Sequence, residues 1–304
     1  MLRALLLELA KSSRLRRWIT SNGTTRGLAQ RFVPGEDLGA ALEAARRSNQ
    51  AGMTVSLDHL GENVLTRGDA ERARQAYTNA LDRIAAENLN AKVSLKLTHL
   101  GLDLGDEFCA KQLRIVTQRA AALGNFVRVD MEGSAYTDRT LQIVKQARAE
   151  TAAVGTVIQA YLYRSEKDIQ DLLSIGCRIR LVKGAYKEPS EIAFPRKKDV
   201  DANYVKLMQL LLPSEIYHAL ATHDPNMIDA TTQFAAERSI PKDKFEFQML
   251  YGIRTDLQNR LVREGYRVRV YIPFGQDWFP YFMRRLAERP ANLIFFAQNL
   301  LRRG

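Results

Sequence analysis

Short runs rich in Val, Ile, Leu, Tyr and Phe recur along most of the chain, and each has the length of a β-strand. These runs occupy residues 53–59, 92–97, 126–131, 156–162, 178–184, 216–223, 244–249 and 267–272. The segments between them carry apolar residues at helical spacing. This pattern predicts helices at residues 71–86, 110–123, 138–149, 166–175, 202–212, 226–238 and 256–264.

Local signals mark where these helices begin and end. The expected N-caps are Asp138, Ser165 and Asp224. Glycines stand where helices should stop, just before the next strand: Gly124, Gly176 and Gly265. Strands that alternate with helices predict a parallel sheet, and eight such units favour closure into a (β/α)8 barrel of the TIM type. No GxGxxG fingerprint follows the first strand, so a Rossmann fold is not expected.

The remaining segments flank the predicted barrel. We expect residues 1–35 to form a helical N-terminal lead and residues 36–304 to form the catalytic barrel, with a first helix at 37–48. Two helices are expected after the last strand, at 278–289 and 292–303. The lead begins with an apolar run but carries Glu8 and no clear cleavage site. We therefore interpret it as an amphipathic helix rather than a secretory signal.

Composition narrows the class of protein. The 304 residues are 46 % hydrophobic and 26 % charged, as in ordinary folded proteins, which excludes a disordered or collagen-like chain. The two cysteines, Cys109 and Cys177, leave no Cys/His metal cluster and fit the reducing cytoplasm. The net charge of +11 suits an anionic partner or an acidic membrane surface. A nucleic-acid partner is not expected, because the sequence has no binding motif for one.

The ends of the predicted strands carry many polar and ionisable side chains. They include Asp58, Lys96, Asp130, Glu132, Gln159, Arg180, Lys183, Tyr186, Thr222, His223, Gln248 and Tyr271. Taken alone, Asp58 or Gln248 is more simply a solvated strand-end group. The whole set at one end of a barrel predicts an active site, because that is where barrel enzymes place theirs. One chemistry open to this set is a lyase or aldolase with a Schiff-base lysine, Lys96 or Lys183.

The helix expected after the last strand, WFPYFMRRLAER, has a distinctive face. Tyr281, Arg284, Arg285 and Glu288 recur there at i, i+3, i+4 and i+7. Two guanidinium groups beside a phenol can bind a carboxylate, because the planar fork matches its two oxygens. Surface pairing of arginine with glutamate is the alternative explanation of the same spacing.

Several segments from Val55 to Asn292 resemble the proline dehydrogenase family, in its short monofunctional bacterial form. They are SLDHLGE (56–62), SLKL (94–97), VDMEG (129–133), QAYLYR (159–164), RLVKGAYKE (180–188), ATHD (221–224), FQMLYG (247–252), RVYIPFG (269–275) and YFMRRLAER (281–289). The resemblance implies a distorted (β/α)8 barrel that binds FAD. It also implies oxidation of L-proline to Δ1-pyrroline-5-carboxylate by hydride transfer to FAD, the first step of proline catabolism to glutamate.

The resemblance assigns roles to individual positions. The catalytic residues would be Asp130, Arg180 and Lys96, with Asp130 holding Lys96 in register. The substrate would be bound by Lys96, Arg284, Arg285, Tyr271, Tyr281, Tyr186 and Leu250. FAD would be bound by Met131, Gln159, Arg180, Val182, Lys183, Gly184, Ala185, Thr222, His223 and Glu288.

The resemblance also implies partners and movement. Glu62 would pair with Arg284 as a lid over the substrate, and no metal is expected. Electrons would pass to a membrane quinone. We therefore expect a cytoplasmic protein with peripheral contact at the inner face of a bacterial membrane, favoured by the net charge of +11.

Overall fold

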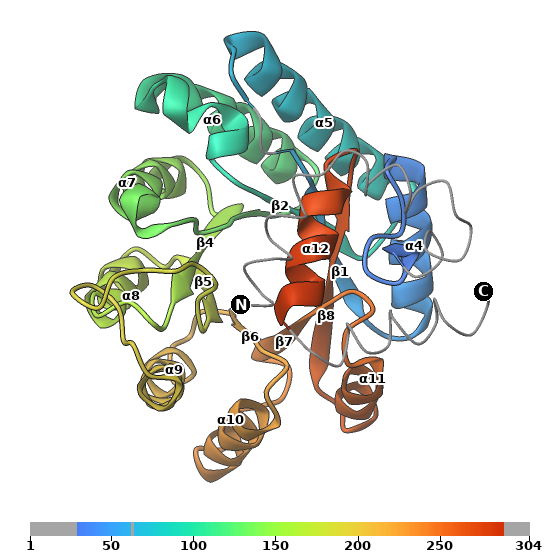
Figure 1. The fold of residues 1–304 in the computed structure, drawn as a ribbon. Coiled ribbons are helices and arrows are strands. Elements are labelled where there is room, and N and C mark those ends of the chain that lie inside the picture. Colours follow the sequence, from blue (N-terminus) through green and yellow to red (C-terminus); the bar gives the residue numbers. More distant parts are fainter. Residues whose placement is uncertain (1–28, 62–63, 289–304) are drawn as a thin grey trace.

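The computed structural model describes residues 29–61 and 64–288, without the side chains of residues 284–288. Its parallel strands follow one another in chain order, and the last pairs with the first to close a barrel. The strands are β1 (Thr54–His59), β2 (Ala91–Leu95), β3 (Val127–Val129), β4 (Val154–Gln159), β5 (Arg178–Val182), β6 (His218–Ala221), β7 (Phe245–Leu250) and β8 (Arg267–Phe274). The predicted (β/α)8 barrel is confirmed (Figure 1).

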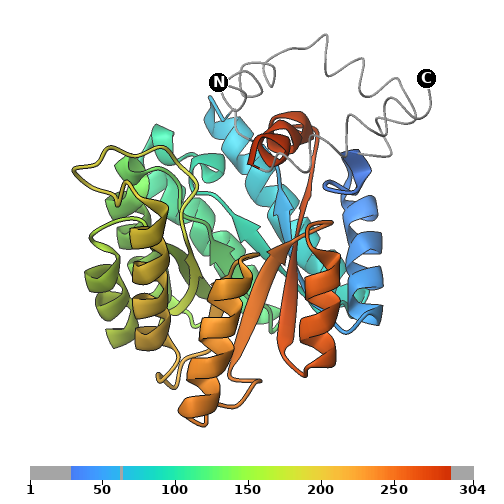
Figure 2. The same cartoon turned by 60° about the horizontal axis from the view of Figure 1, so that its bottom comes forward.

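Helices surround the barrel and follow the strands in turn (Figure 1). They are α4 (Leu38–Gln50), α5 (Arg67–Ala86), α6 (Asp106–Ala122), α7 (Ser134–Glu150), α8 (Ser165–Ser174), α9 (Lys197–Leu211), α10 (Pro225–Glu237), α11 (Thr255–Arg263) and α12 (Trp278–Glu288), with short 3-10 turns η1 (Thr98–Leu100) and η2 (Leu102–Leu104). Helix α12 differs from the others because it lies across one end of the barrel. This is the end where the strands terminate (Figure 2). The helix expected at 292–303 lies outside the described residues.

Some helix boundaries follow the local sequence signals. The Asp224 side chain caps α10 by accepting a hydrogen bond from the Asn226 amide, as predicted. The three glycines predicted to follow helix ends have positive φ angles, which favour glycine. The φ angles are 62° at Gly124, 67° at Gly176 and 85° at Gly265. Helix α5 begins earlier than expected, because Thr66 and the residue at N3 form a reciprocal capping box.

Two of the predicted N-caps are wrong. Helix α7 begins at Ser134, four residues before Asp138, and its N-cap is Gly133. A glycine has no side chain to cap a helix, and the missing acceptor is supplied by Glu188, whose carboxylate accepts from the Ser134 amide at 2.8 Å. Ser165 is the first residue of α8 rather than its cap. The N-terminus of α7 is thus capped by Glu188, which is distant in sequence, and not by a residue next to the helix.

Both faces of the strands are largely buried, but the two faces differ in polarity. Along β1, Val55 and Leu57 alternate with Ser56 and Asp58, and all four side chains are buried. Successive side chains of a strand point to opposite faces. The apolar set joins the core between the barrel and its helices. The polar set therefore points into the barrel, whose interior is partly hydrophilic.

A buried ion-pair cluster occupies that interior. The Glu246 carboxylate accepts hydrogen bonds from Arg269 Nε at 2.8 Å and from Lys92 Nζ at 3.3 Å. Burial alone would raise the pKa of Glu246, but the two cations outweigh it and lower the pKa. Arg128 is buried beside them and donates to the Thr156 carbonyl at 2.7 Å. These groups link strands on opposite sides of the barrel and support the side chains nearer its end.

Both cysteines are part of the core. Cys109 and Cys177 are buried and form no disulfide. Burial raises the pKa of the Cys109 thiol to about 12 and also raises that of Cys177. Both side chains therefore stay protonated and pack as small apolar residues.

The described end of the predicted lead packs against α12. Phe32 and Val33 share a buried cluster with Trp278 and Phe282. The Trp278 indole also donates a hydrogen bond to Glu36 Oε1 at 2.8 Å. The orientation of α12 over the barrel end is therefore set partly by residues that precede the first strand.

Candidate active site

The predicted site residues lie toward the C-terminal end of the barrel strands. Helix α12 covers this end (Figure 2). Most of them stand at or just beyond the C-terminal ends of separate strands. They are Lys96 after β2, Asp130 after β3, Gln159 in β4, Arg180 in β5, Leu250 in β7 and Tyr271 in β8. Barrel closure therefore assembles in one place the groups that the sequence places far apart.

Asp130 is the centre of a hydrogen-bond network at this end. Its Oδ1 accepts from Arg180 Nη1 at 2.6 Å and from Ser94 Oγ at 2.8 Å. Its Oδ2 accepts from the Tyr271 hydroxyl at 2.9 Å. Ser94 Oγ accepts in turn from Arg180 Nη2 at 3.3 Å. One carboxylate thereby fixes the orientation of a guanidinium and a phenol that come from opposite parts of the barrel.

The Tyr271 phenol is held in its protonated form. Burial raises its pKa well above the ordinary value, and the negative charges of Asp130 and Asp58 raise it further. The Arg180 guanidinium also lies 5.4 Å from the centre of the Tyr271 ring, within the range of a cation–π interaction. Tyr271 is therefore a fixed hydrogen-bond donor rather than a proton acceptor.

Lys96 forms the second ion pair of the site. Its Nζ lies 3.6 Å from Asp58 Oδ2. Burial would lower the pKa of Lys96, but the Asp58 and Asp130 carboxylates outweigh this effect and raise it above its ordinary value. Lys96 therefore remains a cation. The resemblance implies that Asp130 holds Lys96. In the structure Asp130 acts on Lys96 only through its charge, and Asp58 forms the salt bridge.

The side chains that end β3 and β4 form one wall of the site. Met131 is buried, and Gln159 Nε2 donates to the Glu132 carbonyl at 3.0 Å. The Glu132 carboxylate accepts from the Thr98 hydroxyl at 2.7 Å. Burial raises the pKa of Glu132 in spite of this hydrogen bond. Next to Asp130, this wall therefore presents the thioether of Met131, the amide of Gln159 and the buried carboxyl group of Glu132.

The segment after β5 follows a turn that requires glycine. Gly184 has φ of 118°, and a Cβ at this position would lie 2.3 Å from the Tyr161 ring. No other residue could place the backbone against that ring without moving it. Val182 and Gly184 are partly exposed and Ala185 is exposed. The backbone of this segment is therefore accessible at the barrel end.

Lys183 is paired with two carboxylates. Its Nζ donates to Asp201 of α9 and to Asp224 at 2.6 Å. Asp224 is also the N-cap of α10, and its amide donates to the Thr222 hydroxyl at 3.0 Å. Lys183 and Thr222 thus lie together at the junction of β5, β6 and α10, as predicted for neighbouring positions of one site.

His223 supports the end of β7. Its Nε2 accepts a hydrogen bond from the Leu250 amide at 2.9 Å. Because a backbone N–H can only donate, this ring nitrogen carries no proton. His223 is therefore neutral, and it positions Leu250 at the barrel end.

The predicted residues near α12 are only partly described. Tyr281 is buried and belongs to the cluster of α12, Phe32 and Leu60, against which Leu250 packs. Tyr186 is 43 % exposed. The remaining predictions fall on Glu62 and on the side chains of Arg284, Arg285 and Glu288, which lie outside the described residues.

The structure differs from the sequence-based expectation at three residues. Asp58 is 1 % exposed and pairs with Lys96, so the interpretation as a solvated group is wrong, and the same holds for Gln248 at 3 %. Ser94 of the Asp130 network is not among the residues that the strand-end pattern predicts. The available signal is its position two residues before Lys96, which directly follows β2, because side chains two apart along an extended chain point to the same side.

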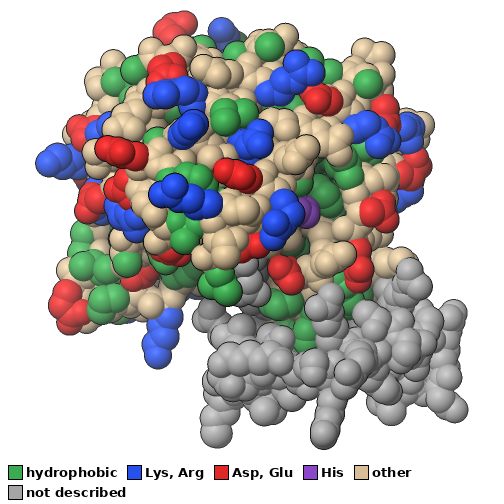
Figure 3. Space-filling view, turned by 90° about the horizontal axis from the view of Figure 1, so that it is seen from above, with side chains coloured by type: hydrophobic (Ala, Val, Ile, Leu, Met, Phe, Trp, Pro, Cys, Tyr) green, Lys and Arg blue, Asp and Glu red, His purple; other side chains and the backbone are tan. Residues whose placement is uncertain are grey.

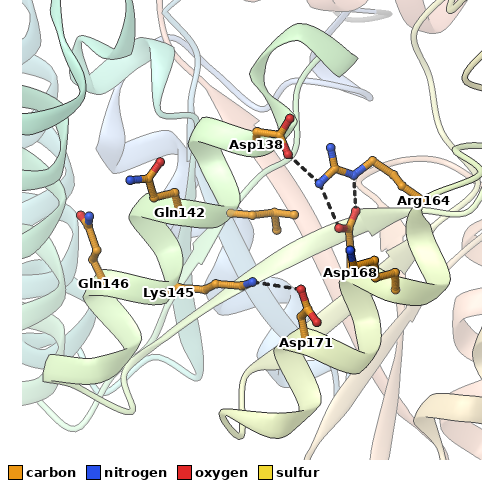
Figure 4. A pocket seen from close by; sticks show the side chains of 9 residues that line it. Asp138, Gln142, Lys145, Gln146, Arg164, Asp168 and Asp171 are labelled. Carbon is orange, nitrogen blue, oxygen red and sulfur yellow. Dashed lines mark hydrogen bonds and ion pairs between the residues drawn. The ribbon is translucent and has the colours of Figure 1, made fainter.

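A separate groove of about 590 Å³ lies on the outer wall between α7 and α8 (Figure 4). Arg164 pairs there with Asp138 at 2.7 Å and with Asp168 at 2.7 Å. Lys145 pairs with Asp171 at 3.2 Å. These charges compensate one another across the groove, and none of the predicted site residues lines it. The ion pairs therefore hold α7 against α8, and the groove is not part of the candidate site.

The fold and the site define an enzyme of the (β/α)8 class, with paired ionic side chains at the C-terminal ends of its strands. Residues 41–298 match the family described as proline dehydrogenase. The chain belongs to the proline dehydrogenase family.

Similar proteins agree with this assignment. The chain is 43 % identical to proline dehydrogenase 1 of Bacillus subtilis (strain 168) over 303 residues, which cover 100 % of both chains. It is 40 % identical to the proline dehydrogenase of Deinococcus radiodurans over 280 residues, which cover 90 % of each. The predicted resemblance to the short monofunctional form is confirmed.

Solved structures give the same fold. The crystal structure of proline utilization A from Bdellovibrio bacteriovorus, inactivated by N-propargylglycine, matches with a TM-score of 0.82 and 29 % identity. The match covers 87 % of this chain and 33 % of that one. A proline utilization A mutant from Bradyrhizobium japonicum, D779Y, matches with a TM-score of 0.75 and 26 % identity, over 90 % and 32 %. The chain thus spans about a third of these longer proteins.

Proposed function

We propose that this protein oxidises L-proline to Δ1-pyrroline-5-carboxylate, the first step of proline catabolism, with FAD as its cofactor. Family membership supports the reaction and the cofactor. The structural observation that supports the proposal is a pair of cations at the barrel end, each held by a carboxylate: Lys96 by Asp58 and Arg180 by Asp130. Fixed positive charges suit an anionic substrate and a cofactor that gains negative charge.

The residues at the barrel end fit FAD. Arg180 Nε and Gln248 Oε1 are buried and have no hydrogen-bond partner among the described residues, so polar capacity remains there for a bound group. We propose that FAD is held by Met131, Gln159, Arg180, Val182, Lys183, Gly184, Ala185, Thr222, His223 and Glu288. FAD, when bound, accepts the two electrons that leave the substrate.

The protein's own groups prepare proline for oxidation. The amine of proline must lose its proton before C5 is oxidised. Lys96 stays cationic because nearby carboxylates raise its pKa, so it disfavours a second positive charge on the substrate amine. We assign the substrate carboxylate to Arg284 and Arg285, which would fix the ring in one orientation.

Further side chains complete the proposed pocket. We propose that Tyr271, Tyr281 and Leu250 pack around the pyrrolidine ring, with Tyr186 and Glu62 closing the site. The Tyr271 hydroxyl already donates to Asp130 at 2.9 Å, so its ring is held in place before proline binds. A wall that is already ordered reduces the entropic cost of substrate binding.

The lyase suggested by the sequence alone is disfavoured. A lysine that forms a Schiff base needs a neutral amine and hence a lowered pKa. The pKa of Lys96 is raised instead, by Asp58 and Asp130 against the effect of burial. Lys183 is bound by Asp224 at 2.6 Å and by Asp201, which leaves its amine engaged with two carboxylates.

We further propose a quinone as electron acceptor and peripheral contact with an anionic membrane. No helix in the part of the chain that the structure describes is long and apolar enough to span a bilayer. Basic and acidic side chains are interspersed on the face seen in Figure 3. Residues 1–28 hold six Lys and Arg against one Glu, which is a net charge of +5 out of the +11 of the whole chain. We propose that the N-terminal lead and the barrel of residues 36–304 are separate units. We propose further that the positive charge of the lead binds it to the anionic membrane surface.

Membrane contact is tested by sedimentation with lipid vesicles. The full chain is expected to co-sediment with vesicles rich in phosphatidylglycerol at low salt, and to be released as salt rises. Vesicles of phosphatidylcholine alone serve as the control. Equal binding to both vesicle types, or none to either, would contradict an electrostatic contact.

The reaction is tested by an absorbance spectrum of the purified protein before and after L-proline is added under argon. Flavin bands near about 375 and 450 nm that bleach with proline are the expected result. A flavin that stays oxidised would refute proline as substrate, and a colourless protein that takes up no FAD would refute the cofactor.

Individual roles are tested in the same assay. Arg285→Met should raise the KM for proline by about 100-fold or more while FAD stays bound, since a bidentate charged contact is lost. Arg263→Met is the matched control, because Arg263 is an exposed arginine at the end of α11. An unchanged KM for Arg285→Met would remove that residue from the carboxylate site.

A further inference from the structure

The connection from β5 to α9 carries several of the proposed contacts with substrate and cofactor. Residues 183–196 include Gly184, Ala185 and Tyr186, and almost none of them belongs to a helix or a strand. Tyr186 is 43 % exposed, so core packing does not hold it. Something else must fix this segment if Tyr186 is to close the site in one geometry.

One anchor of the segment is Tyr161, in the turn after β4. The Tyr161 amide donates to the Lys183 carbonyl at 2.9 Å, and the Tyr161 carbonyl accepts from the Phe194 amide at 2.8 Å. The two ends of the segment are therefore bound to the same residue. The ring of Tyr161 also lies against Gly184. The Tyr161 hydroxyl also interacts with the Tyr186 backbone, so this anchor reaches into the middle of the segment.

The second anchor is Glu188. Its carboxylate accepts from the Ser134 amide at 2.8 Å and from the Ser134 hydroxyl. The Tyr161 hydroxyl donates to the same carboxylate at 3.4 Å. Ser134 opens α7, whose N-cap Gly133 has no side chain, so Glu188 supplies a cap from 54 residues away. A carboxylate at a helix N-terminus is favoured both by the free amides and by the helix dipole.

Glu188 thereby connects two parts of the site. Helix α7 begins directly after the VDMEG segment that contains Asp130 and Met131. Tyr186 is two residues before Glu188 in the same irregular segment, so the bonds of Glu188 restrict where the Tyr186 backbone can lie. The cap of α7 therefore ties the exposed turn of Tyr186 to the wall that holds the Asp130 network.

We infer that Glu188 is a positioning residue, which holds the segment of Tyr186 at the barrel end through its bonds to Ser134 and so sets the affinity for proline. This inference rests on the proposed function. The bonds within the Asp130 network and the Asp58–Lys96 pair do not involve Glu188. Removal of Glu188 should therefore weaken substrate binding and leave the oxidation step nearly intact.

The test compares Glu188→Ala with Glu191→Ala. Glu191 lies in the same segment, is exposed, and accepts from the adjacent Ser190 hydroxyl at 3.1 Å. Both changes remove one negative charge. We expect Glu188→Ala to raise the KM for proline about tenfold, the effect of one lost charge-assisted hydrogen bond, with kcat within about twofold of wild type. Glu191→Ala should leave both constants unchanged.

Two further measurements separate positioning from general damage. Glu188→Gln keeps an oxygen that can accept from the Ser134 amide, so it should recover much of the lost affinity. Hydrogen exchange followed by mass spectrometry should show faster exchange at 134–138 and 185–194 in Glu188→Ala, and wild-type exchange in Glu191→Ala. This second readout does not depend on activity.

The outcomes distinguish this inference from the proposed function. A wild-type protein that fails to oxidise proline would refute the proposed function, and the affinity claim with it. An active wild type with an unchanged KM in Glu188→Ala would refute this inference alone. A fall in kcat with loss of FAD and an unchanged KM would also refute it, because that pattern indicates a structural role.

Discussion

Replacing Asp130 by asparagine would isolate the contribution of one negative charge to the candidate site. An asparagine Oδ1 can still accept from Arg180 and Ser94, which both bind Oδ1 in the structure. Its Nδ2 would face the Tyr271 hydroxyl, which can accept a hydrogen bond in place of donating one. The shape of the network is therefore kept, and the charge at its centre is lost.

The size of the effect follows from the contacts. Three hydrogen bonds to a carboxylate become bonds to an uncharged amide, and each is weaker by roughly 1 kcal/mol. The site would lose about 3 kcal/mol of orienting interaction, which corresponds to about 100-fold in kcat/KM if it is expressed in the transition state. Arg180 would also stay buried without a counter-charge. We therefore expect a fall in stability of about 3 kcal/mol.

The assay measures proline oxidation with an artificial electron acceptor, together with urea unfolding of the same preparations. Ser94→Ala is the companion variant, since it removes one hydroxyl contact and keeps the charge. We expect it to lose about tenfold in kcat/KM. If Asp130→Asn stayed within about twofold of wild type in kcat/KM, the charge would not organise this site and the reasoning would be refuted.

Three further predictions concern the support of the site. Glu246→Gln removes the carboxylate that compensates Lys92 inside the barrel, so urea unfolding should show a loss of about 3–5 kcal/mol, and a loss below about 1 kcal/mol would contradict it. His218 accepts from a backbone amide through Nδ1, and burial lowers its pKa to about 3. Below about pH 6.5 the unfolded chain alone binds the proton, so stability should fall by about 1.4 kcal/mol per pH unit down to about pH 3, and His218→Gln should lack this component in unfolding curves at pH 8 and 5.5. Trp278→Phe breaks the hydrogen bond to Glu36 that orients α12, and kinetics should show a KM for proline about fivefold higher at a similar kcat, with an equal effect on kcat arguing against this role.

The sequence alone determined the type of fold and most of the candidate site. Its strand-length apolar runs predicted the order of the barrel elements, because strand and helix periods depend on neighbours along the chain. The strand-end rule predicted that Lys96, Asp130, Arg180 and Tyr271 would meet, because every parallel strand of a closed barrel ends at the same rim. The segments RLVKGAYKE and YFMRRLAER indicated the family, which the comparisons confirm.

Only the tertiary structure decided which of these groups pair. A strand's alternation tells which face a side chain occupies, but not which side chain stands across the barrel from it. Taken alone, the position of Asp58 at a strand end predicts a solvated group, but barrel closure places it beside Lys96. Helix α7 begins where Glu188 can cap it, so its start depends on a residue that no local pattern could connect to Ser134. These pairings depend on distances between segments far apart in sequence, and folding alone sets those distances.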